Sequence, residues 1–316
     1  MKMRTTTHRP VTVFFLVLPY THIMDLAGPD QVFLEAAGYG AEISVRYCST
    51  TPRLHTSAHL PFGPLKHYSR MTPSAGDIIL VPGAELSYLL SSEFRRDKEV
   101  RAWLRRSHAD GVTVGSICSG AFVLGEAGLL NGRRCTTHWK RTQELQKRYP
   151  EALVQENILY TFQEGIYTSA GIASGIDMAL AIVERLAGPH LAHTVAREMV
   201  IYTRRNGEQH QQSEVMLYRN HIHSGIHAVQ DRLTAHLDER TTLFDLAETA
   251  CMSARNLTRI FRKETGVSVN DYITILRRER IRQLLKNPDL TRRQIAQQVG
   301  LKSERQVNRL LSGTAV

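Results

Sequence analysis

Cysteine is scarce in this sequence, and no apolar run is long. Four cysteines occur among 316 residues, and Cys48, Cys118, Cys135 and Cys251 lie far apart, without paired or metal-like spacing. This spacing excludes a disulfide-rich scaffold and a cysteine-based zinc site, and it suits a reducing compartment. The longest apolar stretch, residues 11–18, has the length of a strand and falls far short of the ~20 residues that span a membrane. Residues 1–10 lack the apolar core of an export signal. We therefore expect a cytoplasmic protein with no membrane segment.

Acidic residues are in the minority, which gives a formal net charge of +10. Residues 1–224 carry 24 Lys and Arg against 20 Asp and Glu, whereas residues 225–316 carry 16 against 10. The shorter C-terminal part thus holds the larger excess, as expected of a segment that meets phosphate groups. Charge alone fits an ordinary solvated surface equally well, so the helix pattern has to decide.

The C-terminal part has the pattern of a helix-turn-helix unit. Leu243, Leu246, Ala247 and Ala250 form one apolar stripe of a helix. After a short turn, Ser253 is placed as the N-cap of a second helix, residues 254–265. Its inward residues are Leu257, Ile260 and Phe261. A small helix, a tight turn and a second helix with a basic outer face fit the DNA major groove.

The pattern then recurs. A basic amphipathic helix is predicted over residues 273–286, and Asn287-Pro288 ends it because proline cannot continue a helix. Thr291 caps a short helix over residues 292–299, and residues 304–311 form a second candidate reading helix. Two such helices could enter successive major grooves, ~34 Å apart.

We expect the outer faces of both reading helices to contact DNA. The predicted contacts are Ser253, Arg255, Thr258, Arg259 and Arg262 in the first unit, and Glu304, Arg305, Gln306 and Arg309 in the second. Arginine can bind guanine with two hydrogen bonds, which suits base reading. Arg262, Lys263 and Arg277 are expected to be phosphate contacts or solvated charges.

These residues resemble the AraC/XylS family of transcription regulators over about 85 residues. The resemblance rests on order and spacing, including Leu246-Ala247, residues 257–262, Thr265-Gly266, Tyr272, Ile295-Ala296 and Val299-Gly300. One departure is Leu301, which stands where the family usually has an aromatic residue. The resemblance implies an all-α tandem helix-turn-helix domain, a double-stranded DNA operator and a possible contact with RNA polymerase.

The first two hundred residues alternate between strand and helix patterns. Strands are predicted over residues 11–18, 42–48, 77–83 and 112–117, and helices over residues 31–37, 95–108 and 120–127. Such alternation predicts an α/β domain with a parallel sheet covered on both faces. Ligands of these sheets bind at the carboxyl ends of the strands.

One cysteine lies at such an end. Cys118 falls between a predicted strand and a predicted helix, among small residues. A sharp strand-to-helix turn can hold a reactive side chain above the sheet, and a helix N-terminus favours a thiolate or a bound anion. The alternative is a small buried cysteine used for packing, which is the more common role.

The stretch from Cys118 to Trp139 resembles the PfpI-like branch of the class I glutamine-amidotransferase superfamily, and more narrowly the sensor domain of GlxA-type regulators. Further matching stretches are residues 25–29, 81–83, 168–171, 175–177 and 204–207. The resemblance implies a flavodoxin-like α/β sandwich over residues 10–203, a linker over residues 204–226, and an AraC-type DNA-binding domain over residues 227–316. It also implies a homodimer that responds to a small-molecule effector.

In the enzymes of this superfamily, an elbow cysteine is the nucleophile, a histidine assists it, and a carboxylate lies near the thiol. Cys118, His138 and Asp25 match these positions. Asp25 is one methylene shorter than the usual glutamate, and Ser119 stands where many hydrolytic members have histidine. Both departures favour a sensor without catalytic activity. A Cys118-dependent hydrolase or deglycase is the alternative.

As a sensor, the same pocket needs no chemistry. Asp25, Cys118, Ser119, His138 and Trp139 are the expected ligand-binding residues, and a carboxylate beside an aromatic face suits an amine or quaternary ammonium effector. Each residue also has a structural alternative: Trp139 as a core aromatic, His138 as a packed histidine and Asp25 as a helix N-cap.

The predicted linker contains several histidines but no regular ligand spacing. His210, His221 and His223, with His227 just beyond, are irregularly placed, and no acid or cysteine joins them in register. We therefore expect no metal and no cofactor. A second alternative for the whole chain is a general nucleic-acid binder, whose affinity would follow salt rather than sequence.

Overall fold

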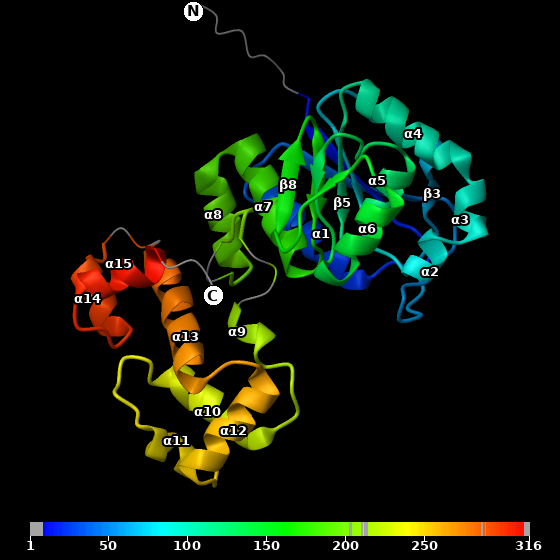
Figure 1. Ribbon diagram of the computed structural model, residues 1–316. Helices are drawn as coiled ribbons and strands as arrows, with labels where there is room; N and C mark the ends of the chain where they lie inside the picture. Colours follow the sequence, from blue (N-terminus) through cyan, green and yellow to red (C-terminus); the bar gives the residue numbers. More distant parts are fainter. Residues whose placement is uncertain are drawn as a thin grey trace, which may run out of the picture. The chain divides into compact units, whose positions relative to one another are not determined.

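The structure is a computed structural model, and it describes residues 9–201, 204–209, 211, 214–285, 287 and 289–312. The chain folds as two compact units, Met1–Gln211 and Gln212–Val316. Figure 1 shows a sheet covered by helices in the first unit and a cluster of helices in the second. Across the described ranges, no helix is both long and apolar enough to cross a membrane.

The first unit is built on a seven-stranded sheet in the order β3-β2-β1-β4-β5-β9-β8, in which only the β8–β9 pair is antiparallel. The strands are β1 (Val11–Leu16), β2 (Ile43–Ser49), β3 (Lys66–His67), β4 (Ile78–Val81), β5 (Thr113–Ile117), β8 (Tyr160–Gln163) and β9 (Ile166–Ser169). A small second sheet pairs β6 (Arg134–Cys135) with β7 (Leu153–Val154). The predicted α/β fold with a mainly parallel sheet is confirmed.

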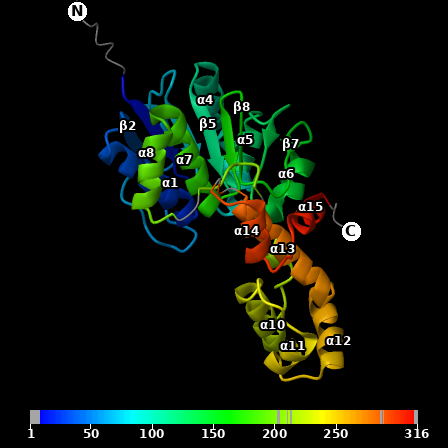
Figure 2. The ribbon, with the colours of Figure 1, turned by 90° about the vertical axis from the view of Figure 1, so that its left-hand side faces the viewer.

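Helices cover both faces of this sheet, as Figure 2 shows for α1, α7 and α8 on one side and α4, α5 and α6 on the other. Their bounds are α1 (Ile23–Gly38), α2 (Leu86–Leu89), α3 (Ser92–Arg96), α4 (Lys98–Ala109), α5 (Gly120–Glu126), α6 (Thr142–Arg148), α7 (Ala173–Ala187) and α8 (Pro189–Glu198). Strand β1 shows why a strand covered on both faces needs apolar residues on each of them. Val13 and Phe15 belong to the core under α1, whereas Phe14 and Leu16 belong to the core under α4 and α5.

Two helices differ from the sequence prediction. The helix predicted over residues 31–37 begins at Ile23 and runs through Pro29. Proline removes one intrahelical hydrogen bond, but the extra turns are held by packing on α7, where a Cβ on Gly28 would lie 2.8 Å from Ile176 Cγ1. The helix predicted over residues 95–108 is divided into α3 and α4, because the Asp97 side chain caps the second helix at Val100 N, 3.2 Å away.

The second unit consists of helices only within its described residues. They are α9 (Glu214–Leu217), α10 (Ser224–Ala235), α11 (Leu243–Thr249), α12 (Ala254–Thr265), α13 (Val269–Leu284), α14 (Arg292–Gln298) and α15 (Glu304–Ser312). Leu257, Phe261 and Tyr272 are fully buried in the first helix-turn-helix core. Ile295 and Val307 are fully buried in a smaller second core. Helix α13 contributes residues to both cores and so joins the two helix-turn-helix motifs.

The predicted reading helices are found where expected, while the connecting helix differs at its ends. Helix α12 has the predicted bounds, and α15 extends one residue beyond them. Helix α13 begins at Val269 rather than at residue 273 because Ser268 and Asp271 form a capping box. Lys286 and Pro288, at its predicted end, lie outside the described residues. Leu301 is partly buried and packs against the second core.

The segment predicted as a linker, residues 204–226, is divided between the two units. Residues 204–209 and Gln211 belong to the first unit, and α9 and the start of α10 belong to the second. Described residues of this segment form contacts within the first unit or within the second, on either side of the division. Val215 and Tyr218, for example, pack against the first helix-turn-helix core.

Candidate ligand site and nucleic-acid interface

Four chain segments meet at the carboxyl edge of the sheet. Asp25, Gly83, Cys118 and Gly171 follow β1, β4, β5 and β9, which are neighbours in the sheet. Cys118 has a φ of +55°, a strained conformation for a residue with a side chain. Its N–H donates to the Ser169 carbonyl at 2.9 Å, which fixes the turn. The predicted strand-to-helix elbow is therefore present, with Asp25 beside it.

Two glycines make room for this elbow. A Cβ on Gly171, which has a φ of +99°, would lie 2.4 Å from Cys118 Cβ and 2.9 Å from its Sγ. A Cβ on Gly83 would lie 2.4 Å from Asp25 Oδ2. Neither position accepts a side chain without displacing the site, so the glycines form a close cradle around the thiol and the carboxyl.

Asp25 is fully buried, and its two carboxyl oxygens differ in their hydrogen bonds. Oδ1 accepts a hydrogen bond from Ile172 N at 2.6 Å, whereas Oδ2 has no hydrogen-bond partner within the described chain. Burial raises the pKa of Asp25, in opposition to the Ile172 hydrogen bond and to nearby His22. Hydrogen bonding by the nearby Cys118 thiol also lowers the pKa of Asp25, although the geometry leaves Oδ2 itself without a partner among the described residues. Since His22 holds the N-cap position of α1, Asp25 is not the N-cap.

Cys118 is also buried and kept protonated. Burial raises the pKa of its thiol well above the usual range, and the Asp25 charge raises it further. The helix N-terminus therefore does not produce a thiolate here, because burial and a neighbouring carboxyl outweigh it. The Ser119 hydroxyl accepts from Ala84 N at 2.9 Å and donates to Ala84 O at 2.6 Å. Ser119 thus holds the turn after β4.

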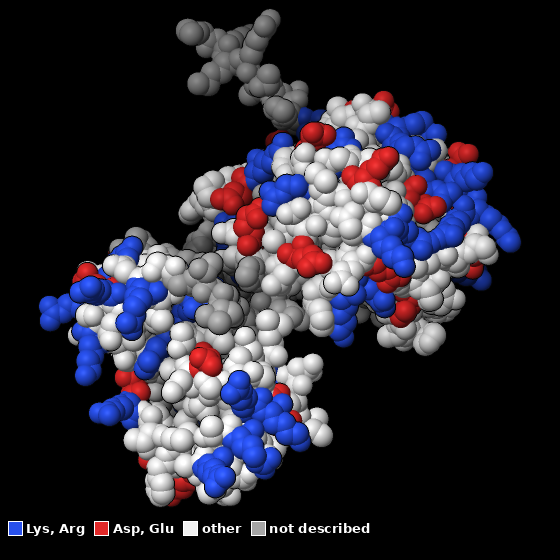
Figure 3. Space-filling view, in the orientation of Figure 1, with Lys and Arg blue, Asp and Glu red and all other residues white. Residues whose placement is uncertain are grey.

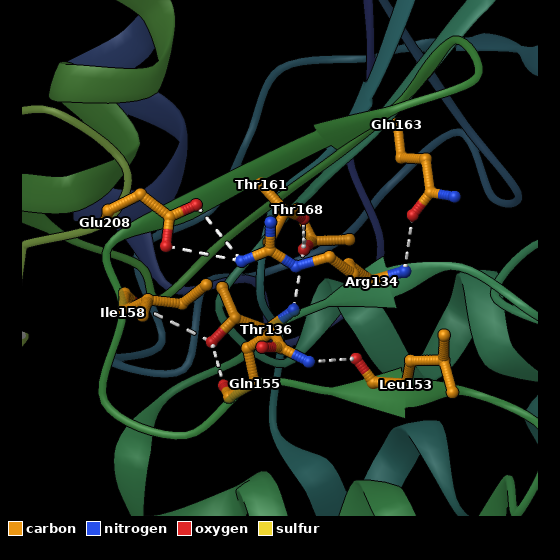
Figure 4. Close-up of polar contacts among 9 residues, drawn as sticks. All are labelled: Arg134, Thr136, Leu153, Gln155, Ile158, Thr161, Gln163, Thr168 and Glu208. Carbon is orange, nitrogen blue, oxygen red and sulfur yellow. Dashed lines mark hydrogen bonds and ion pairs between the residues drawn. The ribbon is translucent and has the colours of Figure 1, made fainter.

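The segment that carries His138 and Trp139 is tied to the elbow by threonines. Thr137 Oγ1 donates to the Cys118 carbonyl at 2.7 Å. Thr136 N donates to Thr168 Oγ1 at 2.7 Å, and the Thr161 and Thr168 hydroxyls are also 2.7 Å apart. Figure 4 shows Thr136, Thr161 and Thr168 of this network, where β6, β8 and β9 meet. It places residues 137–139, hereafter the site loop, beside the elbow.

His138 does not pair with the thiol. Its Nδ1 accepts from Lys140 N at 3.3 Å, and no hydrogen bond between His138 and Cys118 occurs among the residues that the structure describes. Burial lowers the pKa of His138, as do the charges of Lys140 and Arg141. The neutral imidazole caps the turn that follows, so the base beside the sulfur is the Asp25 carboxyl rather than His138.

Trp139 lies at the surface rather than in the core. Its side chain is 41% exposed, and the Lys140 ammonium lies 5.1 Å from the centre of its ring. The interpretation of Trp139 as an ordinary core aromatic is therefore wrong. An aromatic face that already holds a cation is suited to a cationic ligand.

His22 is a site residue that sequence reasoning missed. Its Nδ1 lies 3.1 Å from Ser57 Oγ, and its charge acts on the pKa of both Asp25 and His138. It therefore lies near both residues, at the N-cap of α1. His22 precedes Asp25 by three positions, and this spacing matches no sequence motif. Only the fold shows that His22 belongs to the site.

Helix α12 presents an exposed polar face. Its exposed residues line one shallow surface depression of about 560 Å³, namely Arg255, Thr258, Arg259, Arg262 and Lys263. The opposite face buries Leu257 and Phe261 completely. Figure 3 shows lysine and arginine gathered on this unit. The predicted inner and outer faces thus separate as expected.

Two polar residues at the start of α12 prepare this face. Ser253 Oγ accepts from Asn256 N at 3.3 Å and so caps the helix. Asn256 Oδ1 accepts from Arg259 Nη2 at 2.9 Å, which orients the guanidinium. Asn256 was absent from the predicted contacts, although its position one turn before Arg259 on the helix could have indicated it.

Helix α15 offers fewer free groups. Glu304, Arg305 and Arg309 are exposed. Gln306 is half-buried, and its Oε1 accepts from Lys302 N at 2.7 Å, so it stabilises the turn before the helix.

Arg277 is half-buried and bonded to the chain, so it is not a freely solvated charge, while its predicted phosphate contact stays a prediction. Its Nε donates to the Val299 carbonyl at 2.8 Å and its Nη2 to the Gly300 carbonyl at 3.5 Å. Burial lowers the pKa of its guanidinium. The side chain satisfies carbonyls at the end of α14, where intrahelical donors run out.

Comparison with known proteins assigns both units. A family model described as the DJ-1/PfpI family matches residues 11–185, and one described as a helix-turn-helix domain matches residues 246–312. The chain belongs to the DJ-1/PfpI family. The predicted order of a PfpI-like domain followed by an AraC-type helix-turn-helix domain is confirmed.

Three relatives illustrate the range of this family. The HTH-type transcriptional regulator CdhR of Pseudomonas aeruginosa is 33% identical over 64% of this chain and 60% of its own. The regulator GlxA of Rhizobium meliloti is 28% identical over 63% and 61%. The isonitrile hydratase of Pseudomonas putida is 30% identical over 58% and 76%. The chain thus spans about three-fifths of the length of the regulators that it matches.

The first unit also resembles solved structures. One is an AraC family transcriptional regulator from Pseudomonas putida, at 21% identity and a TM-score of 0.52. The match covers 60% of this chain and 100% of the other. This likeness supports the DJ-1/PfpI-like fold of the first unit.

Proposed function

We propose that this protein is a sequence-specific DNA-binding transcriptional regulator whose first unit binds a small effector. The exposed face of α12 carries this proposal, because Arg255, Thr258 and Arg259 project from a helix whose other face packs into the core. Arginine on a reading helix suits guanine, and neighbouring cations suit phosphate. The matched helix-turn-helix domain and the regulators among the relatives support it.

The effector is an amine or quaternary ammonium compound that binds at the elbow. Asp25 Oδ2 is buried without a partner, and Trp139 already holds a lysine ammonium over its ring. A cationic ligand would give the carboxylate a counter-charge and compete with Lys140 for the aromatic face. Cys118 and His138 would form the walls, and His22 the rim.

The regulator would act as a homodimer, since paired reading heads double the DNA site. Effector binding would change operator occupancy or contact with RNA polymerase. Such coupling requires that the effector binds DNA-competent and other states with different affinity.

A Cys118-dependent enzyme is a second candidate, because one relative is named as a hydratase. The high thiol pKa and the absence of a histidine partner within the described site oppose it. Turnover of an isonitrile that is lost in Cys118→Ser would favour this candidate over the sensor.

The proposal can be tested in two steps. Selection from random DNA would yield a preferred sequence, which a non-specific binder would not give. Thermal unfolding is then followed against amino acids, polyamines, betaines and carnitine-like compounds. We expect one class to raise the midpoint in the parent but not in Asp25→Ala. No preferred sequence would overturn the DNA-reading part, and no shift across the panel would overturn the effector class.

A further inference from the structure

A strap of chain closes the first unit before the helix-turn-helix unit begins. We define the strap as residues 204–209 and Gln211. The Gly207 carbonyl accepts from Leu159 N at 2.9 Å, so the strap lies along the start of β8. A Cβ on Gly207 would lie 2.3 Å from the Tyr160 carbonyl oxygen, which shows how closely the two chains approach.

Ion pairs hold the strap as well. The Arg205 guanidinium binds Asp177 Oδ2 through Nε at 2.9 Å and Nη2 at 2.6 Å, and Asp177 is almost fully buried on α7. Glu208 receives two hydrogen bonds from Arg134 Nη2, at 3.1 and 3.2 Å, as Figure 4 shows. These contacts fix the strap without involving the site loop.

Gln211 is different, because its side chain binds the site loop itself. Its Oε1 accepts from Trp139 N at 2.8 Å, and its Nε2 donates to the carbonyls of Thr137 at 3.0 Å and Ile158 at 2.9 Å. Its own N–H donates to the Asn157 carbonyl at 3.2 Å. One amide thus satisfies backbone groups on both sides of His138.

The position of Gln211 in the chain gives this contact a meaning. Gln211 is the last residue of the first unit, and the helix-turn-helix unit begins at the next residue. On the other side of the site loop, Thr137 Oγ1 donates to the Cys118 carbonyl at 2.7 Å. A continuous series of hydrogen bonds therefore runs from the elbow, through the site loop, to the point where the chain leaves the unit.

We infer that Gln211 is a positioning residue that couples the site loop to the strap, so that occupancy of the elbow site changes how firmly the chain is held where the helix-turn-helix unit starts. This inference rests on the proposed function. A ligand that moves Trp139 or His138 must strain or release the Gln211 amide, and release of the amide must in turn loosen the loop, because coupling between two sites is reciprocal. Release would leave the Trp139 N–H and the carbonyls of Thr137 and Ile158 without the amide, so the bound and released arrangements differ in these hydrogen bonds.

The coupling can be measured without effector or DNA, which separates its failure from failure of the proposed function. The full-length chain has two tryptophans, so Trp103→Phe leaves Trp139 as the only one. In this background, Gln211→Met removes the amide but keeps a side chain of similar length. We expect acrylamide quenching of Trp139 to rise about twofold, because the site loop loses two hydrogen bonds, at Trp139 N and at the Thr137 carbonyl. Gln211→Glu keeps the acceptor for Trp139 N and should restore part of the protection.

The matched control is Gln209→Met. The Gln209 side chain forms no hydrogen bond in the described part of the strap, so quenching should stay at the parent value. The reverse direction uses Thr137→Val, which removes the hydroxyl bond to Cys118. We expect amide hydrogen exchange in residues 204–209 to become about threefold faster while β1 keeps its protection.

Two outcomes would overturn the inference. If acrylamide quenches Trp139 equally in Gln211→Met and Gln209→Met, the amide does not position Trp139. If Thr137→Val leaves exchange of the strap unchanged although it alters Trp139 quenching, the strap is held by Arg205 and Gly207 alone and the site loop does not act on it. Thermal midpoints of all variants show whether each has folded.

Discussion

The elbow of the first unit and the outer face of α12 use polar side chains in opposite ways. At the elbow, Asp25, Cys118 and Ser119 are buried, and most of their hydrogen-bonding capacity is spent on the chain itself. On α12, Arg255, Arg259 and Arg262 are exposed. Polar groups of the first kind contribute to stability, whereas those of the second kind remain available to a partner.

The difference also explains why an enzyme-like constellation need not be an enzyme. The elbow retains the cysteine, the acid and the histidine, but burial protonates the thiol, and His138 caps a turn instead of contacting the sulfur. The Oδ2 oxygen of Asp25 has no hydrogen-bond partner among the described residues, so the acid keeps one acceptor that this part of the chain does not use.

The largest effect is expected at the glycine cradle. Gly171→Ala should destabilise the first unit by about 3–4 kcal/mol, because it combines a left-handed φ with a clash against Cys118. Urea unfolding followed by tryptophan fluorescence reports on this unit, since both tryptophans lie in it. The control is Gly128→Ala, which has a φ of +71° but no atom within 4 Å of the new Cβ, and should cost about 1 kcal/mol. Equal losses would show that the cradle is not tight.

Thiol reactivity should separate Cys118 from an exposed cysteine. Cys251 is exposed, whereas Cys118 is buried with a raised pKa. With an aromatic disulfide reagent at pH 8, we expect the folded protein to show one fast phase from Cys251, and Cys118 to react at least about a hundredfold more slowly. The fast phase should vanish in Cys251→Ala and persist in Cys118→Ala. The reverse pattern would identify Cys118 as an activated nucleophile.

On α12 the expected loss is in binding and not in stability. Arg259→Ala should weaken binding to the selected DNA sequence by about 1–3 kcal/mol and relax base preference at one position, while the unfolding midpoint stays unchanged. Fluorescence anisotropy with matched and mismatched duplexes measures both effects. Arg96→Ala, which removes the same charge from an exposed site on the first unit, controls for net charge. Unchanged discrimination in Arg259→Ala would exclude base reading by this residue.

The smallest effect concerns the Asp25 carboxyl. Because its pKa is raised in the fold from 3.8, the protonated form is favoured there. This contribution to stability is complete below pH 3.8 and is lost as the pH rises through the folded-state pKa. Asp25→Asn stays neutral, so it should be more stable than the parent at pH 7 by about 1 kcal/mol, and the difference should shrink towards pH 4.

Denaturant unfolding across this pH range provides the test. Asp110→Asn removes a carboxyl from an exposed position and serves as the control for a general effect of losing a charge. An Asp25→Asn variant that is less stable than the parent at pH 7 would mean that the carboxylate has a partner in solution.

Local pattern was sufficient for much of the fold. The bounds of α12 followed from its apolar stripe and the Ser253 cap, and the parallel strands followed from short apolar runs. Failures came where tertiary packing outweighed a local rule. Helix α1 continues through Pro29 because it packs on α7, and the polar segment 204–209 is held by Asp177 and β8 although its composition resembles a linker.

The sequence by itself determined which residues are available: the elbow motif at Cys118, the order of the two domains and the inward and outward faces of the reading helices. These depend on neighbours along the chain, through helical periodicity and turn chemistry. Only the tertiary structure decided what the residues do. It buried Asp25 and Cys118 in a glycine cradle, brought His22 to the same site, turned Arg277 inward and joined Gln211 to the site loop. Protonation and hydrogen bonding depend on burial and on partners distant in sequence, which no local pattern contains.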